Sequence, residues 1–179
     1  DQQYKGLQEE AAKLYETPIF VDDTPGISIT QLRATARRLK QKHNISMVCV
    51  DYLQLMTGGG RFESRQQEIS AISRGLKSIA RELSVPVIAL SQLNRDVENR
   101  DDHRPRMSDL RESGAIEQDA DVIILLHRDD YFKPTEENAG LAQIIIAKQR
   151  NGPVGEVVLR FFREYMRFEN YTRRAEPMQ

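Results

Sequence analysis

Apolar and polar positions along the chain form blocks that predict short strands and amphipathic helices in alternation. Residues 18–23 and 47–50 have strand character, and the second run is continuously apolar, as in a strand that is buried on both faces. Between them, Ser28 is the predicted start of a helix, and Gln31 three residues later completes a capping box. The apolar positions of that helix recur at helical spacing, at Ile29, Leu32, Ala36 and Leu39.

The middle of the chain continues the alternation and then changes character. A glycine run at 58–60 leads into a second predicted helix, whose apolar stripe is Ile69, Ile72, Leu76, Ile79 and Leu83. Another buried strand is predicted at 85–90. Residues 95–112 carry many charges of both signs and have no apolar period, so we expect this segment to be exposed and mobile.

Strands dominate the C-terminal part of the chain. The predicted elements are a short helix around 113–118, strands at 122–126, 142–147 and 154–162, a hairpin turn at Asn151-Gly152, and an edge strand at 165–168. No internal repeat is visible. The whole order predicts an α/β fold with an open, mainly parallel sheet flanked by helices and antiparallel hairpin strands at the C-terminal end.

Length and composition limit the number of domains and the kinds of partner that this protein can have. The 179 residues correspond to one domain, and 26 Lys and Arg against 27 Asp and Glu leave a net charge of −1. Any binding to a polyanion must therefore depend on a local patch. The single cysteine, Cys49, lies between two valines, which predicts a buried and inert thiol. The longest apolar run, 122–126, is too short to span a membrane and no secretory leader is visible, so we expect a cytoplasmic protein with no membrane partner.

The first residues do not look like the start of a complete protein. The chain begins with Asp1 rather than Met, and residues 8–14 already resemble the interior of a helix. We therefore expect a piece of a longer protein, with a residual helix at 1–17, a core at 18–170 and a C-terminal tail at 171–179.

Two polar residues follow neighbouring predicted strands, where parallel sheets bind ligands. Asp51 can hold Mg²⁺ on a nucleotide because Mg²⁺ prefers oxygen ligands. Gln92 can sense a terminal phosphate by hydrogen bonding. A capping role for the aspartate and an ordinary turn role for the glutamine remain alternatives. If both strands are parallel neighbours, however, the two side chains share one crevice.

Cations occupy the end of the strand that precedes the hairpin turn. Lys148 and Arg150 share strand parity, so both project from one face and can reach a phosphoryl group in a neighbouring subunit. An edge strand kept charged against edge pairing is the alternative. Arg111, Glu112 and Gly114 begin the segment before the short helix, where backbone N–H groups and one arginine suit phosphate contacts, although a plain surface loop explains each of them alone.

Other kinds of site find little support. The three histidines lack metal-ligand spacing, there is no Gly-x-Ser-x-Gly elbow, and no Walker A motif occurs in the chain. Asp22, Asp23 and Asp51 leave a metal-dependent nuclease open, provided that the three carboxylates converge on one cation.

Four segments, in order, resemble motifs of the C-terminal RecA-like ATPase domain of DnaB-type replicative helicases. They are VDYLQLM at 50–56, which looks like the Walker B segment, SQLNR at 91–95, DLRESGAIEQDAD at 109–121 and KQRNGP at 148–153. The resemblance covers roughly residues 19–170. It implies a RecA-like fold in a homo-hexameric ring that hydrolyses ATP with Mg²⁺ to move along single-stranded DNA and unwind the duplex.

The resemblance also implies a role for each candidate residue. Asp51 would serve Mg²⁺, and Gln92 would sense the γ-phosphate of ATP. Arg150 would be the arginine finger that reaches the adjacent subunit's ATP, assisted by Lys148. The positions that match the DNA-backbone contacts are Arg111, Glu112 and Gly114.

One part of the family pattern has no counterpart in this sequence. The family's Walker A loop, its catalytic Glu and the N-terminal domain that docks primase would all lie upstream of Asp1. We therefore expect a parent enzyme that is an ATP-dependent helicase with primase and a helicase loader as partners, and an isolated chain that is catalytically inactive. The alternative is a RecA-like piece that acts only as an interaction or oligomerisation module.

Overall fold

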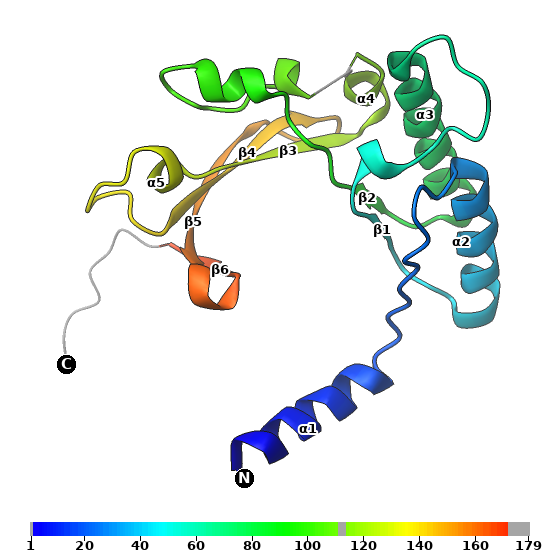
Figure 1. The fold of residues 1–179 in the computed structure, drawn as a ribbon, viewed down its shortest axis with the longest axis horizontal. Helices are drawn as coiled ribbons and strands as arrows, with labels where there is room; N and C mark the ends of the chain where they lie inside the picture. Colours follow the sequence, from blue (N-terminus) through cyan, green and yellow to red (C-terminus); the bar gives the residue numbers. More distant parts are fainter. Residues whose placement is uncertain (1, 111–113, 172–179) are drawn as a thin grey trace.

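A computed structural model gives the arrangement of residues 2–110 and 114–171. The helices are α1 Gln2–Glu16, α2 Ile29–His43, α3 Arg65–Leu83, α4 Gly114–Asp119 and α5 Asp129–Phe132. The strands are β1 Val48–Val50, β2 Val87–Ala89, β3 Val122–His127, β4 Leu141–Gln149, β5 Gly155–Phe162 and β6 Arg167–Asn170. Figure 1 shows them as an open arc, with α2 and α3 at one end, the longer strands at the other, and α1 apart from both.

Two strands form a parallel pair against the long helix. Val48 of β1 lies opposite Val87 of β2, and Val50 lies opposite Ala89. Helix α3 buries the whole apolar stripe expected of it, and Ile69, Ile72 and Ile79 are fully buried. The helical period in the sequence is therefore confirmed as the face that forms the core.

Helix α2 begins as predicted. The Ser28 side chain accepts a hydrogen bond from the Gln31 amide at 3.2 Å, and the Gln31 side chain accepts one from the Ser28 amide at 3.0 Å. The capping box is therefore confirmed. Ala36 is the buried residue of this helix, and Arg33 and Arg37 both pair with Glu82 of α3, which joins the two helices at their outer surface.

The remaining strands form a four-stranded antiparallel sheet in the order β3-β4-β5-β6. The hairpin predicted at Asn151-Gly152 joins β4 to β5. The edge strand lies two residues later than the predicted 165–168, because a 3₁₀ turn at Arg163–Tyr165 and a left-handed Met166 occupy those positions. The fold is thus α/β, with one parallel pair and a set of antiparallel hairpin strands.

The strand predicted at 18–23 is wrong. These residues are extended and exposed, and Val21 is 87% accessible. A strand needs a neighbour to bond with, and among the described residues no strand lies beside this segment. Its apolar residues alone therefore do not make it part of a sheet.

Burial of the parallel pair on both faces is also wrong. Val48 and Val50 are buried, but Cys49 between them is exposed, and so is Ile88 of β2. Helix α3 covers one face of this pair, whereas no described element covers the other. The expected buried thiol is consequently an accessible one.

The charged segment 95–112 is more ordered than its composition predicts. Within its described part it contains two 3₁₀ helices, Arg95–Asn99 and Met107–Asp109. Asp109 is only 6% accessible, pairs with Arg100 and accepts a hydrogen bond from the Arg106 amide at 2.7 Å. Paired charges can be buried where single ones cannot, so charge density alone misjudges this segment.

Helix α1 stands away from the core. All its side chains from residue 4 onward are exposed. No helix in the described ranges is long and apolar enough to cross a membrane.

Candidate nucleotide and nucleic-acid site

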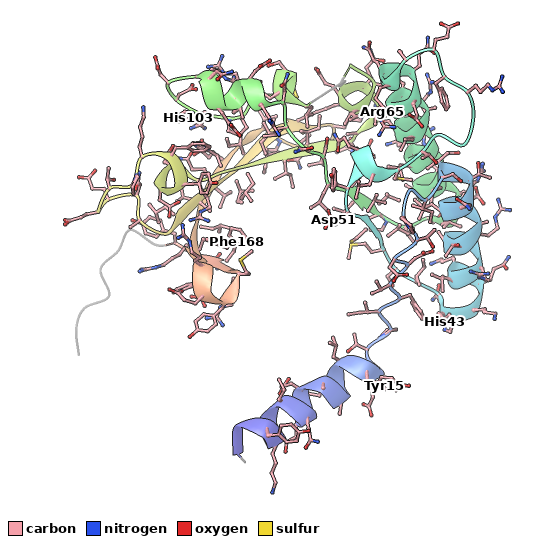
Figure 2. All side chains as sticks on the ribbon, viewed as in Figure 1. Tyr15, His43, Asp51, Arg65, His103 and Phe168 are labelled. Atoms are coloured by element: carbon pink, nitrogen blue, oxygen red, sulfur yellow. The ribbon has the colours of Figure 1, made fainter. Side chains whose placement is uncertain are left out.

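The carboxyl ends of β1 and β2 lie side by side. The Leu90 amide donates to the Val50 carbonyl at 2.9 Å, and the Leu53 amide donates to the Leu90 carbonyl at 2.9 Å. Asp51 directly follows β1, and Gln92 follows β2 by three residues. Both are exposed at this edge, as Figure 2 shows for Asp51, so the two predicted residues lie at the same end of the parallel pair.

Asp51 offers a single free carboxylate at this edge. Within the described part of the chain, its carboxylate has no hydrogen-bond or ion-pair partner, and no group of three or more His, Cys, Asp or Glu residues can hold a metal ion. Mg²⁺ keeps several waters and commonly takes one or two carboxylates plus substrate phosphates. The donor set therefore fits a nucleotide-bound Mg²⁺, whereas the three-carboxylate nuclease that included Asp22 and Asp23 is wrong.

Gln54 links the two strand ends. It lies in a 3₁₀ helix, Leu53–Leu55, that follows β1. Its Oε1 accepts a hydrogen bond from the Gln92 amide at 3.2 Å, and its Nε2 donates to Ser91 Oγ at 3.0 Å. Gln54 is not among the residues predicted for the site. The feature of the sequence that could have pointed to Gln54 is its place as a polar residue among the apolar residues Leu53, Leu55 and Met56.

The start of α3 holds the turn that carries Gln54. Arg65, which Figure 2 labels at α3, donates from Nη2 to the Gln54 carbonyl at 2.7 Å and pairs with Glu68 at 2.5 Å. The Gly58 amide donates to Glu68 at 2.9 Å. That bond, together with the one from Arg65, lowers the pKa of Glu68 below its ordinary value of 4.5.

Lys148 and Arg150 turn toward the end of α4. Lys148 Nζ donates to the Glu117 carbonyl and, at 3.3 Å, to that of Gln118. Arg150 donates to the Gln118 carbonyl at 3.0 Å and lies 3.5 Å from the Asp121 carboxylate. Both cations therefore reach the Gln118 carbonyl, although Arg150 follows β4 rather than belonging to it.

Asp121 is surrounded by positive charge. It bonds to Lys77 of α3, and this bond lowers its pKa, as do the charges of Arg150 and Arg81. A cavity of about 320 Å³ opens beside it. Its lining residues are Arg74, Lys77, Ser78, Arg81, Asp119 and Arg150.

The predicted residues thus fall into two groups. Asp51 and Gln92 lie at the ends of the parallel strands, whereas Lys148 and Arg150 lie beside the end of α4. Among the described residues, no hydrogen bond or ion pair joins the first pair of residues to the second. Gly114 is the exposed first residue of α4. The other predicted DNA contacts, Arg111 and Glu112, lie outside the described residues.

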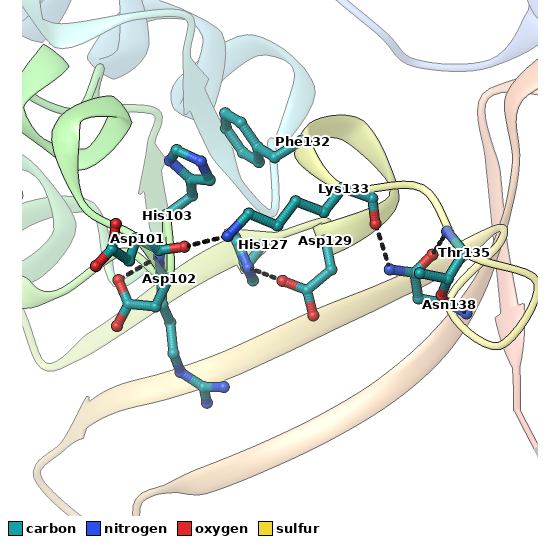
Figure 3. Close-up of a pocket in the computed structure, with 10 residues that line it drawn as sticks. Asp101, Asp102, His103, His127, Asp129, Phe132, Lys133, Thr135 and Asn138 are labelled. Atoms are coloured by element: carbon teal, nitrogen blue, oxygen red, sulfur yellow. Dashed lines mark hydrogen bonds and ion pairs between the residues drawn. The ribbon is translucent and has the colours of Figure 1, made fainter.

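A separate cavity of about 410 Å³ lies beside α5 (Figure 3). His103 stacks on Phe132 at 4.3 Å between ring centroids, and His127 bonds to Asp129 at 2.6 Å. The cavity contains none of the predicted site residues.

Sequence comparison finds close relatives. The model of the DnaB-like helicase C terminal domain matches residues 1–170. The replicative DNA helicase DnaC of Bacillus subtilis is 59% identical over 164 residues, and the replicative DNA helicase DnaB of Geobacillus stearothermophilus is 59% identical over 162 residues. These matches cover 91% and 90% of this chain but 36% of each relative.

Solved structures with the same fold agree. A DnaB-like replicative helicase, described with its interactions with primase, has a TM-score of 0.90 at 44% identity, over 96% of this chain and 42% of that one. A second solved structure, described as an ATPase domain, has a TM-score of 0.91 at 44% identity, over 96% of this chain and 61% of that one.

Proposed function

This chain belongs to the family of DnaB-like helicase C-terminal domains, and from that premise we propose that it is the C-terminal part of a hexameric replicative DNA helicase. That enzyme couples ATP hydrolysis to movement along single-stranded DNA and to unwinding of the duplex. The observation that carries the proposal is the family match over residues 1–170, because this range contains all four motif segments. We propose the cytoplasm as its location, because that is where a bacterial replicative helicase would meet DNA.

Asp51 and Gln92 form the part of the ATP site that this chain contributes to its own nucleotide. Asp51 holds Mg²⁺, directly or through water, and the cation neutralises charge on the phosphates. Gln92 hydrogen-bonds the γ-phosphate through its neutral amide, and so distinguishes ATP from ADP. The free carboxylate of Asp51 and the exposure of both residues at one edge support these roles.

Lys148 and Arg150 act on the ATP of the adjacent subunit. A guanidinium stabilises the charge that develops on the transferring phosphoryl group, and Lys148 assists it. Their place supports this role, since they lie together at the end of β4 and make no contact with their own chain's Asp51 and Gln92 among the described residues.

Arg111, Glu112 and Gly114 contact the backbone of single-stranded DNA. Gly114 is exposed, and a main-chain amide without a side chain beside it suits a phosphate oxygen. Replacing Arg111 with Ala in the full-length protein should weaken single-stranded DNA binding and reduce the salt dependence by about 0.7 in the logarithmic slope. An unchanged slope in fluorescence-anisotropy titrations at several salt concentrations would argue against a phosphate contact.

Partners follow from the same premise. One structural relative is described with its interactions with primase, and we extend primase binding, together with a helicase loader, to the full-length protein. Its cofactors are ATP and Mg²⁺. The chain itself contains no Walker A motif, so we infer that the isolated 179 residues do not turn over ATP.

Steady-state ATP hydrolysis tests this function. The full-length protein should hydrolyse ATP with Mg²⁺, be stimulated by single-stranded DNA, and unwind a forked duplex. The isolated chain should show no turnover above that of a mock purification. A full-length protein that forms no ring and hydrolyses no ATP would favour the interaction module instead.

A further inference from the structure

The hydrogen bonds around the strand ends point to a residue that acts through Gln92. We propose that Gln54 is a positioning residue that holds Gln92 in register with Asp51 during ATP hydrolysis. The inference deepens the proposed function and rests on it. It adds no contact with nucleotide, because Gln54 bonds to the protein backbone and to Ser91.

Both ends of the Gln54 amide are used. Oε1 accepts from the Gln92 amide at 3.2 Å, while Nε2 donates to the Gln92 carbonyl at 3.4 Å and to Ser91 Oγ at 3.0 Å. The amide of Gln54 thus bonds both the N–H and the C=O group of Gln92. A side chain with only donors or only acceptors cannot reproduce this pattern.

Gln54 is itself held firmly. Its neighbours Leu53 and Met56 are 3% and 2% accessible, so the short helix that carries it is anchored in the core. Arg65 bonds to the Gln54 carbonyl at 2.7 Å, which ties this position to α3. The Gln54 side chain is therefore fixed by a rigid element, and it can hold Gln92 at a defined position relative to that element.

Gln92 lies between two stretches of main chain that are bonded at Leu90 and at Asn94. The pairing of β2 with β1 ends at Ala89, and beyond it two main-chain bonds join the strand ends, from the Leu90 amide to the Val50 carbonyl and from the Leu53 amide to the Leu90 carbonyl. Across the described residues, Gln54 supplies the hydrogen bonds made to the Gln92 main chain. Leu93 forms a bridge with Leu110 and the Asn94 amide donates to the Asp109 carbonyl at 2.7 Å. Among the described residues, however, only the Gln54 bonds tie Gln92 itself to the segment that follows Asp51. A misplacement of about 1 Å can cost roughly 100-fold in rate.

The first experiment separates binding from turnover in the full-length protein. Gln54→Met keeps the length of the side chain and removes the hydrogen bonds. We expect kcat for ATP to fall at least about tenfold, with KM changed by less than about threefold, since the nucleotide contacts remain. Gln41→Met, at an exposed position of α2, is the matched control and should retain the wild-type kcat. Wild-type kcat in the Gln54→Met variant would overturn the proposal.

The second experiment is a double-mutant cycle with Gln92→Ala. If Gln54 acts through Gln92, kcat of the double variant should lie within about threefold of that of Gln92→Ala alone. Losses that multiply would mean that Gln54 has a merely structural role, and would reject the proposal. If Gln54→Met does not fold, Ser91→Ala decides by removing one partner: a fall in kcat of at least about twofold supports the proposal, and wild-type kcat overturns it.

The wild-type measurement keeps the two levels of inference apart. A full-length wild-type protein that does not hydrolyse ATP would reject the proposed function itself. An active wild-type protein with an equally active Gln54→Met variant would reject only the positioning role.

Discussion

The two cations at the end of β4 are held by acceptors of their own chain. Lys148 and Arg150 bond to main-chain carbonyls of α4, and Arg150 also lies close to Asp121. Arg150 remains 47% accessible, so it can exchange these acceptors for a phosphate without passing through the core. The role proposed for Arg150 in a neighbouring subunit requires this accessibility.

Replacing Arg150 with Ala in the full-length protein should abolish ATP turnover while leaving nucleotide binding measurable. An arginine finger acts on charge that develops in the transition state, and its loss costs about 10³–10⁵ in kcat. Steady-state hydrolysis and equilibrium binding of a fluorescent ATP analogue measure the two effects separately. Arg61→Ala is the control, because Arg61 is exposed and has no ion pair among the described residues. Near-normal turnover in the Arg150 variant would defeat the assignment.

Helix α3 contacts the core, the Gln54 turn and the surroundings of Arg150. Its apolar stripe forms much of the core, its first turn supports the Gln54 turn, and Lys77 reaches Asp121 beside Arg150. One helix thus touches the surroundings of both groups of site residues. Its packing sets their relative position.

Ile72→Ala should destabilise the 179-residue chain by about 2–5 kcal/mol. Ile72 is fully buried in α3, so its truncation removes apolar contacts and leaves a cavity. Ile124→Ala is the matched control, because this strand residue is 60% accessible and should cost about 1 kcal/mol or less. Guanidinium denaturation followed by circular dichroism gives both values. Equal losses at the two positions would contradict the core described above.

The stability of the chain should also depend on the protonation of Glu68. The Gly58 amide and Arg65 lower the pKa of Glu68 in the folded state below 4.5, so its bonds stabilise the fold above about pH 4.5. That contribution is lost as the pH falls through the lowered value. Glu68→Gln should therefore flatten the acid side of a plot of stability against pH, measured by denaturation between about pH 3 and 7.

Glu137→Gln is the control for this effect. Glu137 is exposed and makes no ion pair in the described part of the chain. If Glu68→Gln and Glu137→Gln change the acid side equally, the bonds of Glu68 contribute nothing specific.

At the scale of the whole molecule, apolar side chains are exposed along the strands. Ile88 and Leu90 are 50% and 49% accessible, and Ile124 and Leu126 are 60% and 52% accessible. Exposed apolar patches of this kind mark contact surfaces or cause association.

We expect the isolated 179-residue chain to self-associate. Its weight-average sedimentation coefficient should rise over about a hundredfold range of concentration, because association removes apolar surface from water. The double variant Ile124→Lys with Leu126→Lys should associate less, whereas Thr135→Lys, at an exposed polar position, should behave as the wild type. A chain that stays monomeric over the whole range would contradict the expectation.

Local patterns in the sequence predicted the elements whose causes are local. The capping box at Ser28, the stripe of α3 and the hairpin at Asn151-Gly152 each depend on residues a few positions apart, and the structure confirms all three. Asp51 and Gln92 were selected in the same way, since each follows an apolar strand run, and their roles stay predictions.

Only the tertiary structure decided what depends on residues far apart in the chain. Cys49 is exposed because one face of the parallel pair has no cover among the described residues, the run at 18–23 is no strand because no described strand lies beside it, and Asp109 is buried because Arg100 pairs with it. Gln54 gains its place from Ser91 and Gln92, which are 37 and 38 residues away. Sequence by itself determined the helices α2, α3 and α4 and the polar residues that follow β1 and β2, whereas it predicted neither α5 nor the 3₁₀ helices. Burial, pairing and the positioning contacts belong to the folded chain, because each needs a partner that no local pattern specifies.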